Sequence, residues 1–490
     1  MPSFLVILAL VAFVLVFAGL TEGVVSRAPI SFPIIFLGVG FLLGDRGLGV
    51  ISIMPHSPTL EAVGTITLAL VLFLDAVRMK FDRAASEWLI PSLLLGPGTL
   101  LCLAITATAV HFLFGIGLTG SVLLGAILSS TDPVVLRDMV RDKRIPSAIR
   151  EALTVEAATN DVVVLPIVLV AIAVARAQVS GMGAWALLLT KLLLLGPAIG
   201  FVVGAAGAWL MTRIDRRYGI RREYQALFGM GLVFAAYSGA VAVGGDGFLA
   251  AFAAGAAIAA LDLDLCDCFL EFGDATSEMI MLFAFILFGA VLSTMIGTVP
   301  LAASLGLAAV VLFIARPVAL LIVLGRADIS SSARRFLAWF GPRGLASLLL
   351  ALLAVQAGVP GSEMILAIAG IVVTASVILH GSTATPLTAW YARRLSAATL
   401  AEERVTSASG LLRVKEKQAR DARDARRVGV AELRERLAGP DPPLLLDVRS
   451  RSSYEKDPAG IPGGVRVAPD AAATWAAKQK RDRSIVAYCT

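Results

Sequence analysis

Apolar segments of about twenty residues recur along most of the chain, and they restrict its possible folds more than any other feature. A helix needs roughly 20 apolar residues to cross a bilayer. In lipid, the backbone groups of such a segment must be hydrogen-bonded within the segment, which favours helices. With 58% hydrophobic residues, 16% charged residues and a mean hydropathy of +0.84, the composition excludes an ordinary soluble globular protein. The sequence therefore predicts an all-α protein that crosses the membrane many times.

Thirteen membrane spans are predicted from these segments. They cover residues 3–21, 30–46, 60–79, 89–114, 119–139, 148–174, 184–212, 223–241, 243–261, 275–296, 300–325, 333–356 and 361–383. The first span has no basic residues before its apolar run, and further spans follow it. We therefore expect a retained helix there rather than a cleaved signal peptide.

The loops between the predicted spans alternate in charge. Basic loops at 78–83, 137–144, 213–222 and 325–335 alternate with short loops that carry almost no charge, whereas the loop at 261–274 is acidic. Because basic loops stay in the cytoplasm and acidic residues count little, the pattern predicts an outside N-terminus and a cytoplasmic C-terminus in the cell (inner) membrane. The basic pI of 9.3 then reflects topology, and no nucleic-acid partner is expected.

Five ionisable residues fall deep within the predicted spans. They are Asp132 in span five, Glu156 and Asp161 in span six, Arg316 in span eleven and Arg343 in span twelve. A charge at the membrane centre costs at least about 2.5–3.5 kcal/mol, so these side chains should face the protein interior or water. Glu156 and Arg316 have a purely structural alternative, which is a buried ion pair that holds two helices together without binding an ion. Three acids against two bases leave one negative charge, which has room for one proton or one monovalent cation.

Helix-breaking residues adjoin two of these charges. Pro133 directly follows Asp132, and the sequence GPRG at 341–344 surrounds Arg343. Proline removes an amide donor and disfavours helical geometry in the residue before it. Transporters build cation sites from the freed carbonyls and half-helix ends of such breaks, and Thr131 adds hydroxyl and carbonyl oxygens. A kink with no binding role is the alternative.

The two broken spans, five and twelve, are seven spans apart. Equivalent spans separated by an odd number enter the membrane in opposite directions. We therefore expect spans one to six and eight to thirteen to form two inverted repeats, with span seven as their connector.

The motifs around these charges resemble those of sodium/proton antiporters of the NhaP/NHE kind, in the monovalent cation/proton antiporter superfamily. The matching motifs are STDPV in span five, E-x-x-x-N-D in span six, ARP in span eleven and GPRG in span twelve. GFLAAFAAG in span nine and LFGAVL in span ten are also similar. The resemblance covers roughly residues 1–395. It implies exchange of a monovalent cation, Na⁺ first of all, for H⁺, by a homodimer in which one helix bundle moves against the other. It implies no cofactor.

The resemblance also implies a role for each residue that matches the site motifs. Asp161 would hold a proton and the cation in turn, and Asp132 and Thr131 would line the same site, with Asp161 and Asp132 as Na⁺ ligands. Asn160 would stand where electrogenic relatives carry a second aspartate. Exchange of one cation for one proton would then be electroneutral, which agrees with the single unmatched charge.

Other matching residues are given supporting roles by the resemblance. Glu156 would pair with Arg316 and brace the core, and Arg343 would offset the carbonyl-end dipoles of broken span twelve. Asp75 falls where relatives often carry glutamate near the cytoplasmic funnel; the alternative is an interfacial residue beside basic neighbours. Many relatives have serine where this chain has Ala157, so the choice among Na⁺, K⁺ and Li⁺ stays open.

A few residues fall outside these patterns. Lys191, His111 and His380 are attributed to packing or snorkelling rather than to a site. The four cysteines are too scattered for a disulfide framework.

The chain changes character after the transmembrane domain, which is expected to cover residues 1–391. Residues 392–427 read as a charged cytoplasmic linker helix, and residues 428–490 as a small α/β domain with strands at LLLDVR and SIVAYC. This segment resembles a rhodanese-like domain, with Asp447 and Arg449 in the DVR signature and Cys489 as the catalytic, sulfur-carrying cysteine. The chain stops one residue later, so a truncated domain with little core is expected.

Three classes of function remain open from the sequence. They are a secondary cation/proton antiporter for Na⁺ or K⁺, a cation channel, and a membrane-tethered sulfurtransferase. A channel predicts an open polar file through the membrane, whereas these charges form one cluster beside broken helices. The sulfurtransferase needs residues beyond Cys489. The sequence therefore favours the antiporter.

Overall fold

The chain forms two compact units, Met1–Ser407 and Ala408–Thr490, which are described separately. The computed structural model describes residues 4–25, 31–79, 89–132, 145–177, 181–261, 267–327, 329–394, 430–438, 442–448, 461–467 and 485–488. Most of the predicted linker at 392–427, and Pro133, lie outside these ranges.

The described part of the first unit is helical almost throughout. Its elements are α1 (Phe4–Val25), α2 (Phe32–Leu43), α3 (Pro58–Val77), α4 (Leu89–Leu93), η2 (Leu94–Gly98), α5 (Thr99–Phe114), α6 (Leu118–Ile127), α8 (Ser147–Ala175), α9 (Met182–Thr190), η4 (Lys191–Leu195), α10 (Gly196–Tyr218), α11 (Arg222–Ala242), α12 (Gly247–Ala260), α13 (Asp267–Met295), α14 (Leu301–Val310), η5 (Val311–Ala315), α15 (Arg316–Val323), η6 (Leu324–Arg326), α16 (Ser331–Trp339), α17 (Leu345–Gln356) and α18 (Ser362–Arg394). Among these residues, nine helical stretches are long and apolar enough to cross a membrane. The shorter apolar helices α2, α6, α12 and α17 account for the other four predicted spans. The predicted multi-pass helical fold is confirmed.

Within the described residues, three spans contain a turn of π-helix, and each turn has a proline inside it or close after it. Pro97 lies inside η2, and Pro197 and Pro317 are the second residues after η4 and η5. Proline cannot donate a backbone hydrogen bond, and a wider turn accommodates the missing bond. The turns η2 and η5 interrupt spans four and eleven, which are again seven spans apart. This spacing adds to the expectation of inverted repeats.

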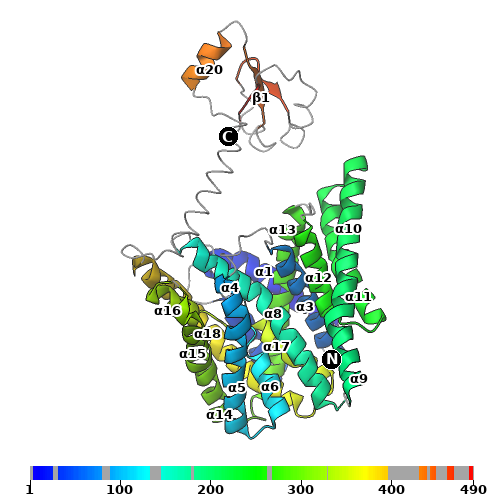
Figure 1. The fold of residues 1–490 in the computed structure, drawn as a ribbon, viewed down its shortest axis with the longest axis vertical. Coiled ribbons are helices and arrows are strands. Elements are labelled where there is room, and N and C mark those ends of the chain that lie inside the picture. Colours follow the sequence, from blue (N-terminus) through cyan, green and yellow to red (C-terminus); the bar gives the residue numbers. More distant parts are fainter. Residues whose placement is uncertain are drawn as a thin grey trace. The chain divides into compact units, whose positions relative to one another are not determined.

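The helices of the first unit pack in two groups (Figure 1). The α12 group contains α3, α10, α11, α12 and α13, with α2 along α13; the α17 group contains α5, α6, α8 and α14 to α18. Within the α12 group, Gly200 and Gly204 of α10 lie directly against the backbone of Ala250 and Ala254 in α12. Small residues four positions apart allow the two backbones to approach this closely. Close packing stabilises the helix pair in lipid, where the hydrophobic effect does not drive helices together.

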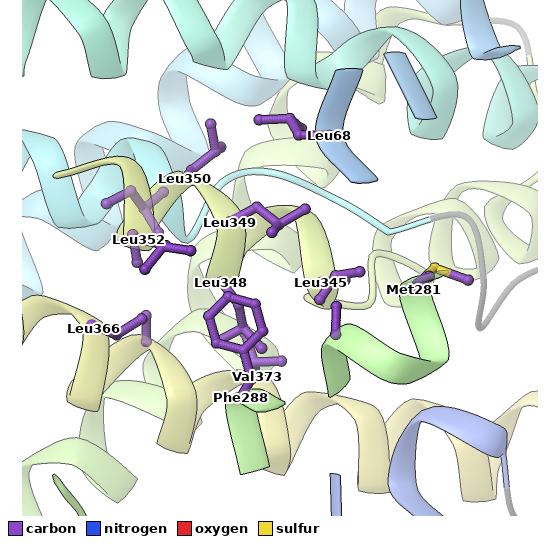
Figure 2. Packing of buried hydrophobic residues seen from close by; sticks show 14 of the residues in the cluster. Leu68, Met281, Phe288, Leu345, Leu348, Leu349, Leu350, Leu352, Leu366 and Val373 are labelled. Atoms are coloured by element: carbon purple, nitrogen blue, oxygen red, sulfur yellow. The ribbon is translucent and has the colours of Figure 1, made fainter. Parts of the chain in front are cut away.

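An apolar seam separates the two groups (Figure 2). Leu68 of α3 and Phe288 of α13 belong to the α12 group, and Leu348 of α17 and Leu366 of α18 belong to the α17 group; all four are buried. Such a seam has no directional bonds to break, although it strongly disfavours an uncompensated charge.

The second unit contains one helix and a parallel sheet. Helix α20 (Val430–Leu437) precedes the strands β1 (Leu444–Asp447), β2 (Val465–Arg466) and β3 (Ile485–Tyr488). The strand order is β2-β1-β3, and both pairs are parallel. The predicted helix and the strands at LLLDVR and SIVAYC are confirmed, whereas the two-residue strand β2 was not predicted. Arg449 and Cys489 lie outside the described residues, so the rhodanese-like reading stays a prediction.

Candidate functional site

The two broken spans cross each other at their interruptions. In span five, α6 ends at Ile127 and residues 128–132 are not helical; in span twelve, Phe340–Gly344 separates α16 from α17. The N–H of Asp132 donates to the carbonyl oxygen of Pro342 at 2.9 Å, and the N–H of Leu345 donates to Asp132 Oδ2 at 2.6 Å. Each break thus satisfies backbone groups that the other leaves free.

The crossing leaves no room for a side chain at Gly344. A Cβ atom there would overlap the carboxylate of Asp132. We expect Gly344→Ala to displace that carboxylate and to lower the thermal midpoint, with a cost of about 1–3 kcal/mol typical of overpacking. The matched control is Gly306→Ala in α14, where a Cβ would meet nothing within 4 Å. Equal midpoints for the two variants in a thermal melt would contradict this close crossing.

Arg343 covers the carbonyl end of span five. Its Nη1 donates to the carbonyl oxygens of Ser129 and Ser130 at 2.6 and 3.0 Å, and its Nη2 lies 3.2 Å from the Sγ of Cys102. This corrects the sequence expectation, which assigned Arg343 to the carbonyl end of its own span twelve. The reason is the crossing, which brings the side chain of one break onto the backbone of the other.

Arg316 takes the place at span twelve that was expected of Arg343. Its Nη2 donates to the carbonyl oxygen of Phe340 at 2.6 Å and to that of Leu337 at 3.3 Å, at the end of α16. The same guanidinium forms a two-pronged pair with Glu156 of α8, at 2.5 and 2.9 Å. The residues predicted as a pair are therefore in contact, with only 2% of Glu156 and 5% of Arg316 exposed.

Asn160 is held by hydrogen bonds on both sides of its amide. Its Nδ2 donates to the carbonyl oxygen of Ser129 at 2.9 Å and to Thr131 Oγ1 at 3.0 Å. Its Oδ1 accepts from the hydroxyl of Thr99 at 3.3 Å. Thr99 was missed by the sequence reasoning; the signal available was a hydroxyl directly after the GPG sequence that interrupts span four. Asn160 thus fastens broken span five to α8.

Asp161 lies beside the same crossing, 5% exposed. Its Oδ1 accepts a 2.5 Å hydrogen bond from the hydroxyl of Ser130. Among the described residues no cationic side chain forms an ion pair with Asp161. Asp161 therefore differs from the other deep charges because its hydrogen-bond partner is a neutral hydroxyl group.

The other deep charges are compensated. Glu156 has Arg316; Arg343 has the carbonyls past the end of α6, and Asp132 has the N–H at the start of α17. Carbonyl ends of helices attract cations and N–H ends attract anions, by about 0.3–1 kcal/mol each when exposed and more when buried. The unmatched negative charge counted in the sequence therefore falls on Asp161.

The oxygen atoms at the crossing suit a small monovalent ion. Thr131 and Asp132, which are 2% and 3% exposed, directly follow Ser130, whose hydroxyl donates to Asp161. In the part of the chain that is described, no three His, Cys, Asp or Glu side chains gather into a candidate metal site. Hydroxyl, carbonyl and carboxylate oxygens of low total charge remain, and these are hard ligands for an alkali cation or a proton.

Asp75 lies elsewhere, in α3 of the α12 group. It is 8% exposed, and its Oδ1 lies 3.5 Å from the guanidinium of Arg78, one turn later in the chain. Arg78 also pairs with Asp274 of α13. The pairing fits the interfacial alternative, and a part for Asp75 in ion binding stays a prediction.

Comparison with known proteins gives three findings. Residues 10–390 match the family described as sodium/hydrogen exchanger, transmembrane. The K(+)/H(+) antiporter NhaP of Alkalimonas amylolytica is 26% identical over 372 residues, which are 74% of this chain and 63% of that protein. The K(+)/H(+) antiporter NhaP2 of Shewanella sp. (strain MR-4) is 26% identical over 386 residues, 78% of this chain and 66% of that protein. The chain thus spans less than two thirds of the length of these curated relatives.

A solved structure has the same fold. The sodium proton antiporter MjNhaP1 from Methanocaldococcus jannaschii, at pH 8, aligns with a TM-score of 0.64 and 21% sequence identity. The alignment covers 79% of this chain and 98% of that structure. The helical architecture of the first unit is therefore shared with it.

Proposed function

This chain belongs to the sodium/hydrogen exchanger family, and on that premise we propose that it exchanges a monovalent cation for H⁺ across the membrane. The single observation that carries the proposal is the carboxylate of Asp161. It is buried where two broken helices cross, and a hydroxyl is its bonded partner while the neighbouring deep charges are compensated. One such carboxylate accepts either a proton or a cation.

Competition at one carboxylate couples the two fluxes. An empty, ionised Asp161 is costly to carry past the apolar seam between the helix groups, whereas a loaded one is neutral. The α12 and α17 groups can then move relative to each other only when a proton or a cation occupies the site. Asp132, Thr131 and Ser130 supply further oxygen ligands for the cation at the crossing.

The direct test is transport by the purified protein in liposomes. We expect a cation gradient to drive the opposite movement of protons, reported by a pH-sensitive dye inside the vesicles. Na⁺, K⁺ and Li⁺ should each be tried, since curated relatives are named for K⁺ and the solved neighbour for sodium. Ala157, which removes a hydroxyl present in many relatives, leaves the preference to experiment. Protein-free vesicles are the control, and equal dye signals from both would refute the exchange.

Exchange is expected to carry no net charge. Asn160 cannot ionise, and its amide is occupied by Ser129, Thr131 and Thr99, so one carboxylate serves one ion per half-cycle. Proteoliposomes adsorbed on a solid-supported membrane should therefore show a pH change without a sustained transport current. A current that grows with the cation gradient would show that a second charge moves and that the inference from Asn160 is wrong.

We further propose a homodimer embedded in the lipid bilayer of the cell membrane, with the N-terminus outside and the C-terminus in the cytoplasm. The alternation of basic and uncharged loops supports this orientation. A single cysteine placed at Arg217, in the basic loop after span seven, should react with an impermeant thiol reagent in inside-out vesicles. Reaction in right-side-out vesicles would show that the orientation is the opposite of the proposed one.

A further inference from the structure

Helix α18, in span thirteen, carries two buried polar residues one turn apart. Ser376 is 0% exposed and His380 is 2% exposed. The sequence reasoning attributed His380 to packing, and Ser376 belongs to none of the motifs that the family resemblance rests on. A histidine and a hydroxyl that are this deeply buried need hydrogen-bond partners, which makes their contacts informative.

The contacts of the pair reach the start of the break in span twelve and a residue near its end. Inside the break, the N–H of Arg343 donates to Ser376 Oγ at 2.7 Å. At its start, His380 Nε2 lies 3.1 Å from the carbonyl oxygen of Trp339, the last residue of α16. His380 Nδ1 lies 3.2 Å from Ser376 Oγ and 3.0 Å from the carbonyl oxygen of Ser376.

The donors and acceptors of this network can be assigned from chemistry. The carbonyl oxygens of Trp339 and Ser376 can only accept, and a neutral imidazole carries one hydrogen; we assign it to Nε2, the tautomer in which the ring bonds the end of α16. In a neutral imidazole, Nδ1 is then an acceptor, and the hydroxyl of Ser376 is the neighbouring group that can donate to it. The bonds form one chain: Arg343 N–H to Ser376 Oγ, Ser376 O–H to His380 Nδ1, and His380 Nε2–H to the Trp339 carbonyl.

We propose that His380, acting with Ser376, is a positioning residue for the cation site. The two side chains bridge residues 339 and 343 and so fix the length and direction of the unwound stretch between α16 and α17. That stretch places the Arg343 guanidinium on the carbonyls of span five and the Leu345 N–H on Asp132. This inference rests on the proposed function of the crossing as a cation site.

If His380 bridges the break by hydrogen bonds, its variants should behave differently than if its ring only fills space. His380→Leu fills similar space and removes both ring nitrogens, and Ser376→Ala removes the acceptor for the Arg343 N–H. Each should raise the KM for the transported cation about tenfold, the scale of one buried hydrogen bond, with a smaller change in maximal rate. Because both act on one bridge, the double variant should be little worse than either single variant. His380→Gln keeps a donor for the Trp339 carbonyl and should recover part of the affinity.

The control is His111→Leu. His111 is exposed in α5, and its Nδ1 lies 2.8 Å from the carbonyl oxygen of Ile116, away from the crossing. Its KM should equal that of the wild type. A folded His380→Leu protein with wild-type KM, or single effects that multiply fully in the double variant, would overturn the inference.

A second readout does not depend on transport. Amide hydrogen exchange of peptides covering residues 339–345 should accelerate at least tenfold in His380→Leu and Ser376→Ala, and stay unchanged in His111→Leu. Unchanged protection of these amides in both site variants would refute the bridge even if the wild type transports no cation. Loss of protection together with absent wild-type exchange would refute the proposed function and retain the bridge.

Discussion

Asp161→Asn is expected to abolish cation-driven proton movement while leaving the protein folded. Asparagine has nearly the same shape as aspartate, and its amide can still contact the hydroxyl of Ser130, which bonds Asp161 at 2.5 Å. It cannot take up a proton at ordinary pH and offers no negative charge to a cation. The loss should be complete rather than partial because each half of the cycle needs the same carboxylate.

The comparison needs two further variants. Asp132→Asn should weaken cation affinity without removing exchange, because an asparagine oxygen can still accept from the N–H of Leu345 at the start of α17. Asp45→Asn, at an exposed aspartate after α2, should behave as wild type in the liposome assay. Full activity in folded Asp161→Asn would remove Asp161 from the transport site.

The second large effect is on stability. Glu156→Gln should destabilise the protein by about 3–5 kcal/mol, because it leaves the charge of Arg316 buried without its acid. Arg316→Ala should cost as much, since Glu156 and the carbonyl of Phe340 both lose their donor. The expected signs are a low thermal midpoint and a low folded yield in detergent, with cation KM changed less than in site variants.

A double variant separates the pair from its surroundings. Replacing Glu156 by leucine and Arg316 by methionine removes both charges, and such exchanges are often neutral or stabilising. Here recovery should be incomplete, because the carbonyls of Leu337 and Phe340 at the end of α16 would still lack the donors that Arg316 supplies. Wild-type midpoints in the single variants would count against a bracing role for the pair.

Much of the fold follows from properties that the sequence carries locally. Span length is fixed by bilayer thickness, so apolar segments predicted the spans well. A break near Asp132 and a break at 341–344 were predictable because proline and glycine there adjoin a deep charge, although α6 already ends at Ile127. The contact of Glu156 with Arg316 followed from the need to compensate two buried charges.

What the sequence could not reveal depends on how distant segments cross. Arg343 was assigned to its own span, because nothing local shows that span five passes beside it. Counting the charges in the spans does not identify Thr99, Ser376 or His380, because these residues were not among the charges that need a partner. Their roles are set by backbone groups that become free only when both breaks form.

The most direct test of the central claim is the number of protons released when the purified protein binds the transported cation. The titration is run in weakly buffered detergent solution, with a pH electrode or calorimetry in buffers of different ionisation enthalpy. If a cation and a proton exclude each other at Asp161, binding should release up to one proton per cation, and affinity should fall about tenfold per pH unit in acid solution. Asp161→Asn should release none. Cation binding with no proton release at any pH would contradict exchange by competition at this carboxylate.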